Sequence, residues 1–390
     1  MLACEDRERT PRLTIEVTGT AIVTRKGLRR ARHGWPWLSK DDIVDYDGDG
    51  GPFVDLVDET SLPMGTALWD PHGPAPIRLL SSARTRDPVG LMQTRLERAV
   101  ARRDIDLVGS DAGRLCAGEA DGLPGLVVDR FGSGLLVAVD AAAMVPVVDA
   151  LLPPLVRRTE ATVVALATKD RVTLLQGTSS SVRFLHGRLE LTVDLAAHVT
   201  RRVTAELEAH RTLRRWARGR CLDLYAGFCG FGLQLADGGA REVTVVDVPA
   251  ILSSNIEDDA RHNQIEARFL RVADDPLAWL RAGTTEHARF DVVVFHPPAV
   301  DADDEAALAR ATEHGVLCLK LLDEGGILAT QPTSPTLDEM TFAAALQEAA
   351  AKSRKRLQIL ARLGPGADHP TLAGVRPPPT LLVARVLATA

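Results

Sequence analysis

The pattern of hydrophobic and polar positions changes twice along the chain. Up to about residue 88, short segments such as Leu13–Val17 and Phe53–Val57 alternate apolar and polar residues at period two, which is typical of half-buried strands. Turns rich in glycine, proline and aspartate separate these segments, for example at Tyr46–Pro52. This pattern predicts a small N-terminal β barrel over residues 1–88.

Residues 89–198 have a mixed pattern, which predicts a small central α/β domain. One helix is expected at Met92–Arg103 and another at Ala143–Arg157. Short apolar runs between and after them predict strands at 125–129, 135–140, 162–167, 172–176 and 189–193.

Residues 199–390 contain continuous apolar strands that alternate with helices. This pattern predicts a mainly parallel sheet covered on both faces, and ligands bind at the carboxyl ends of the strands in such a fold. Strands are expected at 221–225, 242–247, 268–272, 291–295, 326–331 and 381–387, and helices at 203–218, 249–263, 302–322 and 337–354.

Composition narrows the possible functions. A length of 390 residues favours more than one core, and a net charge of −6 with 4% aromatic residues argues against a general nucleic-acid coating protein. No apolar run reaches the roughly 18 residues of a membrane span, and the N-terminus lacks the pattern of a signal peptide. Five cysteines without a C-x-x-C pair predict neither a disulfide framework nor a metal site. We therefore expect a cytoplasmic protein without membrane association.

A basic segment interrupts the predicted barrel and precedes two aromatic residues, Trp35 and Trp37. Clustered cations of this kind suit a phosphate-binding surface, and the alternative is a solvated loop beside two core tryptophans. The candidate RNA-binding residues are Arg25, Lys26, Arg29, Arg30 and Arg32.

The segment Cys221–Gly232 is the most informative for chemistry. A strand ends there in a turn that opens a helix, and Gly227 and Gly230 allow the backbone to approach a ligand. The next strand ends at Asp247, twenty residues after Gly227, where a carboxylate accepts from ribose hydroxyls. The sequence therefore predicts a nucleoside-containing ligand at this turn.

Two ligands are compatible with that turn. A dinucleotide site uses G-x-G-x-x-G, whereas this chain has G-x-x-G-x-G preceded by Asp223, and an acid before the turn suits the amino-acid end of S-adenosylmethionine (SAM) better than a pyrophosphate. A nicotinamide-dependent oxidoreductase and an α/β domain without such a ligand remain minor alternatives. The candidate cofactor-binding residues are Asp223, Tyr225, Gly227, Phe228, Gly230, Asp247, Asp274, Asp275, Pro297 and Pro298.

Several segments together resemble one family. Gly118–Phe131 matches its linking-domain signature, Arg32–Trp37 its basic, aromatic segment, Asp223–Phe231 its SAM-binding motif, and Asp368–Pro370 a late Asp-His-Pro element. The chain is similar over nearly its whole length to the PUA-domain large-subunit rRNA methyltransferases of the cytosine-C5, methyltransferase I type. The resemblance implies three domains, namely a PUA-like RNA-binding domain at 1–88, a central linking domain at 89–198 and a class I (Rossmann-like) SAM-dependent methyltransferase domain at 199–390. It also implies RNA, most directly rRNA, as the partner, and we keep a homodimer open.

The chain differs from that family at the residues expected to carry out the reaction. The family attacks cytosine C6 with a cysteine after the fifth strand, in a Ser-Cys-Ser context, whereas Leu328–Ser334 has no cysteine. The family's Asp-Pro-Pro-Lys is replaced by His296–Ala299, and its Lys-Thr-Gly and Tyr-Leu-Lys elements are also missing. His296 is the candidate catalytic residue because an imidazole can act as a general base toward a hydroxyl or amine acceptor. The alternative function is a catalytically inactive, RNA-binding or ribosome-associated relative.

Overall fold

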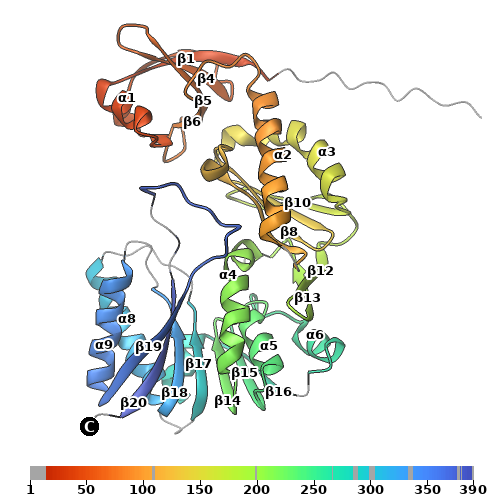
Figure 1. Ribbon diagram of the computed structural model, residues 1–390, viewed down its shortest axis with the longest axis vertical. Helices are drawn as coiled ribbons and strands as arrows, with labels where there is room; N and C mark the ends of the chain where they lie inside the picture. The colour runs from red at the N-terminus through yellow and green to blue at the C-terminus, as the bar shows by residue number, and fades with distance from the viewer. Residues whose placement is uncertain are drawn as a thin grey trace, which may run out of the picture. The chain divides into compact units, whose positions relative to one another are not determined.

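The structure, a computed structural model, divides into two compact units (Figure 1). It describes residues 15–107, 110–197, 200–265, 267–283, 289–297, 304–332, 337–375, 378 and 380–388. Unit 1 comprises Met1–Val100, Gly118–Leu126 and Val139–Thr159, and unit 2 comprises Ala101–Ala117, Val127–Ala138 and Glu160–Ala390. The domain boundaries expected at residues 88 and 198 stay a prediction.

A six-stranded sheet forms the N-terminal part of unit 1. Its order is β2-β6-β5-β4-β1-β3, and Ala21, Val54 and Ala67 belong to its buried core. The strand predicted at 53–57 is confirmed as β4, whereas the one predicted at 13–17 is replaced by a strand that begins at Val17, with residues 13–14 outside the described part. The strands are β1 Val17–Val23, β2 Trp37–Leu38, β3 Ile43–Gly48, β4 Phe53–Asp58, β5 Pro63–Trp69 and β6 Ile77–Ser81.

The basic segment of unit 1 is a helix, so the alternative interpretation of a solvated loop was wrong. This helix, α1, spans Arg25–Arg32, and the Thr24 side chain caps its first turn by accepting from Gly27 N at 3.1 Å. Leu28, within the helix, is buried. The helix has only eight residues, and of these only Gly27 and Leu28 are buried. Its apolar residues are therefore too few to show a helical period in the sequence.

Helices α2 Pro88–Asp106 and α3 Val145–Thr159 lie where the second domain was expected to have helices. The strands of this segment form a five-stranded sheet in the order β11-β10-β9-β8-β7 and a separate hairpin of β12 and β13. The prediction missed β7 and β12, because β7 contains a glycine and an arginine and β12 carries polar residues at its exposed positions. The strands are β7 Ala112–Ala117, β8 Leu126–Phe131, β9 Gly134–Val139, β10 Val163–Ala167, β11 Val172–Gln176, β12 Ser181–His186 and β13 Leu189–Asp194.

The C-terminal part of unit 2 is a seven-stranded sheet in the order β16-β15-β14-β17-β18-β20-β19. The strands from β14 to β18 pair in parallel, and β20 is antiparallel to both of its neighbours. The predicted strands are all present, and β19 was missed because charged residues interrupt this edge strand. The strands are β14 Arg220–Leu224, β15 Glu242–Asp247, β16 Arg268–Ala273, β17 Phe290–Phe295, β18 Leu322–Thr330, β19 Lys355–Leu363 and β20 Leu381–Ala388.

Helices cover both faces of this sheet (Figure 1). On one face Cys221 packs with Leu207 and Leu233, from α4 and α5, and on the other Leu222 packs with Leu317, from α8. The helix predicted from 249 was wrong at its start, because α6 begins at Ile256. The helices are α4 Thr200–Leu213, α5 Gly230–Asp237, α6 Ile256–His262, α7 Pro276–Gly283, α8 Asp304–Lys320 and α9 Glu339–Lys352.

The strand order places β14 between β15 and β17, so the carboxyl ends of these three strands are adjacent. The turn after β14, Asp247 at the end of β15 and His296 after β17 therefore lie along one edge of the sheet. None of the described helices is long and apolar enough to cross a bilayer.

Candidate functional site

The turn after β14 has a strained backbone. Tyr225, Gly227 and Cys229 adopt positive φ angles of 63°, 55° and 67°, a region that only glycine occupies without steric cost. Tyr225 N donates to Val246 O at 2.9 Å, and Cys229 N donates to Ala226 O at 2.7 Å, so hydrogen bonds hold the turn in this shape. Strain concentrated between a strand and a helix is a feature of ligand-binding turns.

Packing also requires a glycine at position 230, the first residue of α5. The sequence had predicted this glycine only for close approach of the backbone to a ligand. A Cβ atom there would lie 2.5 Å from both His210 Cε1 and Phe228 Cζ, which is closer than such contacts ever occur. The absence of a side chain at Gly230 therefore allows α5 to approach α4.

Asp223 lies at the base of the turn and is 1% exposed. Its Oδ2 accepts from Gly232 N at 2.9 Å, while Oδ1 is buried without a hydrogen-bond partner among the described residues. Burial, with smaller contributions from the charges of Asp247 and Glu206, raises the pKa of Asp223 to about 8 although the Gly232 hydrogen bond lowers it. A buried acceptor without a donor is costly, so this oxygen fits the ammonium group of a ligand such as SAM.

Asp247 is 4% exposed and joins the turn to the end of β15. Its Oδ2 accepts from Gly227 N at 2.9 Å, and its Oδ1 accepts from Val248 N at 2.8 Å. Each carboxylate oxygen has a second lone pair. Asp247 can therefore hold the turn and still accept from the hydroxyls of a ribose.

Tyr225 lies near Asp275, one of the two candidate residues that follow β16. Its ring contacts Phe295 edge-on at 5.6 Å between centroids. Burial, followed by the charges of Asp275 and Asp247, raises the pKa of Tyr225 to about 12. Asp274 and Asp275 are exposed, and Asp275 Oδ1 caps α7 by accepting from Ala278 N at 2.7 Å.

The remaining predicted ligand residues are placed differently. The Phe228 ring is in the core, with its centroid 5.6 Å from that of His210 and 6.4 Å from that of Phe184, so only its backbone is available to a ligand. Pro297 is buried. Pro298 lies outside the described residues.

His296, the candidate catalytic residue, is 6% exposed and follows β17 directly. Its Nδ1 is 3.6 Å from Glu206 Oε1, and its ring centroid is 5.5 Å from that of Phe231. The second oxygen of Glu206, Oε2, is 3.7 Å from His210 Nε2. Sequence reasoning missed Glu206 and His210, although their i,i+4 spacing on a predicted helix was a signal that they share a face.

The cysteines near this sheet are unsuited to nucleophilic attack. Cys221, Cys229 and Cys318 are buried, and burial raises the pKa of Cys221 to about 12 and the pKa values of the other two well above the ordinary range. Because the thiolate is the reactive form, the described residues offer no thiol nucleophile at the site.

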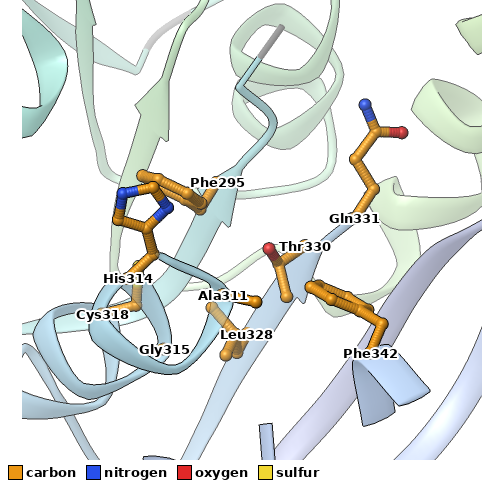
Figure 2. Close-up of a pocket in the computed structure, with 9 residues that line it drawn as sticks. All are labelled: Phe295, Ala311, His314, Gly315, Cys318, Leu328, Thr330, Gln331 and Phe342. Atoms are coloured by element: carbon orange, nitrogen blue, oxygen red, sulfur yellow. The ribbon is translucent and has the colours of Figure 1, made fainter. Parts of the chain in front are cut away.

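A small cavity of about 10 Å³, partly open to solvent, lies at the carboxyl ends of β17 and β18 (Figure 2). His314 lines it, is 7% exposed and has no hydrogen-bond partner for its Nδ1 in the described part of the chain. Phe295 also lines it, one residue before His296. The other lining residues are Ala311, Gly315, Cys318, Leu328, Thr330, Gln331 and Phe342.

The candidate RNA-binding residues lie on α1 in unit 1. Arg25, Lys26, Arg29 and Arg32 are exposed. Arg30 instead donates to Asp42 Oδ2 at 2.7 Å, and its guanidinium carbon is 5.6 Å from the centre of the Trp35 ring. Arg30 is therefore tied to Asp42 and Trp35, and the four exposed cations form the outer face of the helix.

Comparisons with known proteins agree with this arrangement. Residues 21–82 match the family described as PUA-like domain, and residues 207–353 match the family described as Conserved hypothetical protein 95. A ribosomal RNA large subunit methyltransferase I from Salmonella arizonae is 27% identical over 90% of this chain and 93% of its own length. The protein of the same name from Salmonella typhi is 26% identical over the same shares.

Two solved structures have the same fold. A protein assigned to the SAM-dependent methyltransferases, from Streptococcus mutans, aligns with a TM-score of 0.78 at 16% identity, over 94% of this chain and 99% of its own. A second protein assigned as a methyltransferase, solved as a complex with SAH, aligns with a TM-score of 0.79 at 15% identity over the same shares. The predicted resemblance and the predicted α/β fold with a PUA-like domain are confirmed.

Proposed function

We propose that this protein, a divergent relative of the large-subunit rRNA methyltransferase I family, transfers a methyl group from SAM to RNA. Its relatives carry that name over nine tenths of the chain, and the PUA-like domain supports RNA, with rRNA as the finer proposal. The observation that carries the proposal is the strained turn after β14 together with Oδ1 of Asp223, which is buried without a hydrogen-bond partner in the described part of the chain.

Three carboxyl groups are proposed to hold the methyl donor. Asp223 takes its ammonium group, Asp247 its ribose hydroxyls, and Asp274 or Asp275 its adenine amino group. The turn contributes its backbone at Gly227, where a positive φ favours glycine. When bound, SAM supplies an activated methyl group on a positively charged sulfur.

The acceptor is proposed to be a hydroxyl or an exocyclic amine and not cytosine C5. Methylation of C5 requires prior addition of a nucleophile to C6, which makes C5 nucleophilic, and the nearby cysteines are buried with raised pKa values. A hydroxyl or amine requires a base and correct positioning. His296, at the carboxyl end of β17, is proposed as that base.

A catalytically inactive relative is the second candidate function. The lost cysteine and the lost Asp-Pro-Pro-Lys element favour it. It predicts RNA binding without methyl transfer. Methyl incorporation from labelled SAM into rRNA from a deletion strain separates the two candidates, and mass spectrometry of the nucleosides identifies the acceptor atom.

The direct test of the donor site is calorimetric titration with SAM. Asp247→Ala is expected to weaken binding by about 1–3 kcal/mol, because hydrogen bonds of a buried carboxylate are lost. Asp258→Ala is the matched control, since Asp258 is exposed and pairs with Arg261 on the surface. Absence of binding by the unaltered protein at millimolar SAM would contradict the proposal.

Two further points remain proposals. A cytoplasmic location follows from the expected rRNA partner. A homodimer is supported by the exposed edge strand β11, where Leu174 and Leu175 are 39% and 44% exposed, since such edges pair with other chains. Light scattering of the purified protein tests it.

A further inference from the structure

A carboxylate from α4 lies between two histidines beside the proposed site. Glu206 Oε1 is 3.6 Å from His296 Nδ1, and Glu206 Oε2 is 3.7 Å from His210 Nε2. The Glu206 side chain is 19% exposed, and those of His296 and His210 are 8% and 1% exposed. The three side chains therefore form a largely buried His-Glu-His cluster that the sequence did not predict.

We propose that Glu206 is a positioning residue for the reaction, which orients His296 through Nδ1 and stabilises its protonated form. This inference rests on the proposed function, in which His296 is the base, and adds Glu206 as the residue that holds His296 in place. Carboxylates that orient a histidine base act in this way in other enzymes. Distances slightly beyond hydrogen-bond length are common before substrate binds.

In the proposed step the methyl acceptor gains a methyl group and loses a proton, and His296 takes that proton. The lone pair of the acceptor oxygen or nitrogen forms the new bond to the methyl carbon, and the sulfur–carbon bond breaks with its electron pair staying on sulfur. The proton of the acceptor goes to His296 Nε2, on the opposite side of the ring from Glu206. The resulting imidazolium pairs with the Glu206 carboxylate until the proton leaves to solvent.

Glu206 is close enough to Asp223 for the charges of the two carboxyl groups to interact. Its charge contributes to raising the pKa of Asp223, so the two carboxyl groups repel each other when both are ionised. A neutral glutamine at 206 would remove that repulsion and keep a hydrogen-bonding side chain. Retaining the charge is advantageous if His296 becomes positively charged during turnover.

Helix α4 is fixed firmly enough to aim Glu206. Thr204, two residues earlier, donates from Oγ1 to Asp129 Oδ1 at 3.0 Å, and Arg114 makes two hydrogen bonds to the same carboxylate at 2.9 and 3.1 Å. Gly230 allows α5 to pack closely against His210. The hydrogen bonds of Thr204 therefore hold α4 near Glu206, and the packing of α5 holds His210.

The kinetic test compares Glu206→Gln with Glu208→Gln in the full-length protein. Glu208 is on the same helix, its side chain is 44% exposed, and it pairs with Arg211, so it controls for loss of a charge from α4. Glu206→Gln is expected to lower kcat at least about tenfold, with KM for RNA and the Kd of SAM within about twofold of the unaltered protein. Glu206→Asp should recover part of kcat. Equal kcat values for the two glutamine variants would overturn the inference.

A second readout does not depend on activity. In the protein without substrate, the ring ¹⁵N signals of His296, assigned with His296→Gln, should change in Glu206→Gln and stay unchanged in Glu208→Gln. Unchanged His296 signals in Glu206→Gln would also overturn the inference. If the unaltered protein transfers no methyl group, the proposed function fails instead, and the ring signals still report whether the Glu206–His296 pair exists.

Discussion

Asp223 is a buried carboxyl group whose surroundings favour its protonated form. Its pKa of about 8 in the free protein means that it carries a proton at neutral pH. A ligand ammonium beside Oδ1 would favour the carboxylate and lower that pKa. Binding of SAM should therefore release a proton at neutral pH.

The sign of the resulting pH dependence follows from linkage. Below a free-state pKa of about 8, removal of the proton costs less as pH rises, so the affinity for SAM should increase with pH. The increase should be visible between about pH 6 and pH 7.5, since the α-amino group of the ligand itself begins to lose its proton near pH 7.7–8.0. Calorimetry at several pH values measures this slope. Asp223→Asn should flatten it and Asp258→Asn should not, and a slope that survives Asp223→Asn would exclude Asp223 as its source.

Residue positions were predictable where a motif fixes backbone geometry. The spacing from Gly227 to Asp247 correctly placed both at one edge of the sheet, and their hydrogen bond of 2.9 Å joins them. The side of the turn to which Phe228 points was not predictable, because that depends on the packing of α4 against α5. Glu206 was missed for the same reason, since its partner His296 is far away in the sequence.

At the scale of elements, α4 depends on a buried network that joins it to the central sheet. Thr204 Oγ1 donates to Asp129 Oδ1 at 3.0 Å and lies 3.3 Å from His369 Nε2. His369 Nδ1 lies 3.1 Å from Asp368 Oδ1, and Asp368 Oδ2 accepts from Arg114 N at 2.8 Å. The late Asp-His-Pro element therefore helps to fix the helix that carries Glu206.

Thr204→Val tests this anchoring, because valine keeps the shape of threonine and lacks its hydroxyl. The substitution should lower the free energy of unfolding by about 1 kcal/mol, with the Asp129 acceptor left short of one donor. Thr212→Val is the control on the same helix, since the Thr212 hydroxyl only meets Glu208 Oε1 at 3.3 Å and is half-buried, and should cost less than about 0.5 kcal/mol. Urea unfolding measures both. Equal losses would mean that the network does not anchor α4.

Elements were predictable where burial makes a strand continuously apolar, as for β14 and β17 in the middle of the sheet. They were missed at its edge, where charged residues and a glutamine interrupt the apolar positions of β19. Helix α1 was missed because eight residues with five cations give little apolar periodicity. For β19 the deciding contacts come from its partner β20, which is distant in the sequence.

At the scale of the whole molecule, the exposed cations of α1 and the proposed donor site belong to different compact units. A net charge of −6 argues against a general affinity for nucleic acid, yet Arg25, Lys26 and Arg29 on α1 are exposed together. The total charge therefore predicts weak binding to RNA, whereas the local charge of α1 predicts binding at that helix. RNA binding should depend on α1 and strongly on salt, while SAM binding should depend on neither.

The triple substitution Arg25→Gln, Lys26→Gln and Arg29→Gln separates the two activities. RNA affinity should fall, and the slope of log K against log salt should decrease by about 0.7–0.9 for each phosphate that the protein no longer neutralises, as measured by fluorescence anisotropy on rRNA fragments. The Kd of SAM should stay unchanged, whereas Asp247→Ala should change it and leave the salt slope alone. The matched control replaces three exposed cations elsewhere, Arg157, Lys169 and Arg171, and alters the net charge equally. If the control lowers RNA affinity as much as the α1 variant, total charge and not the α1 face governs binding, and α1 loses its proposed role.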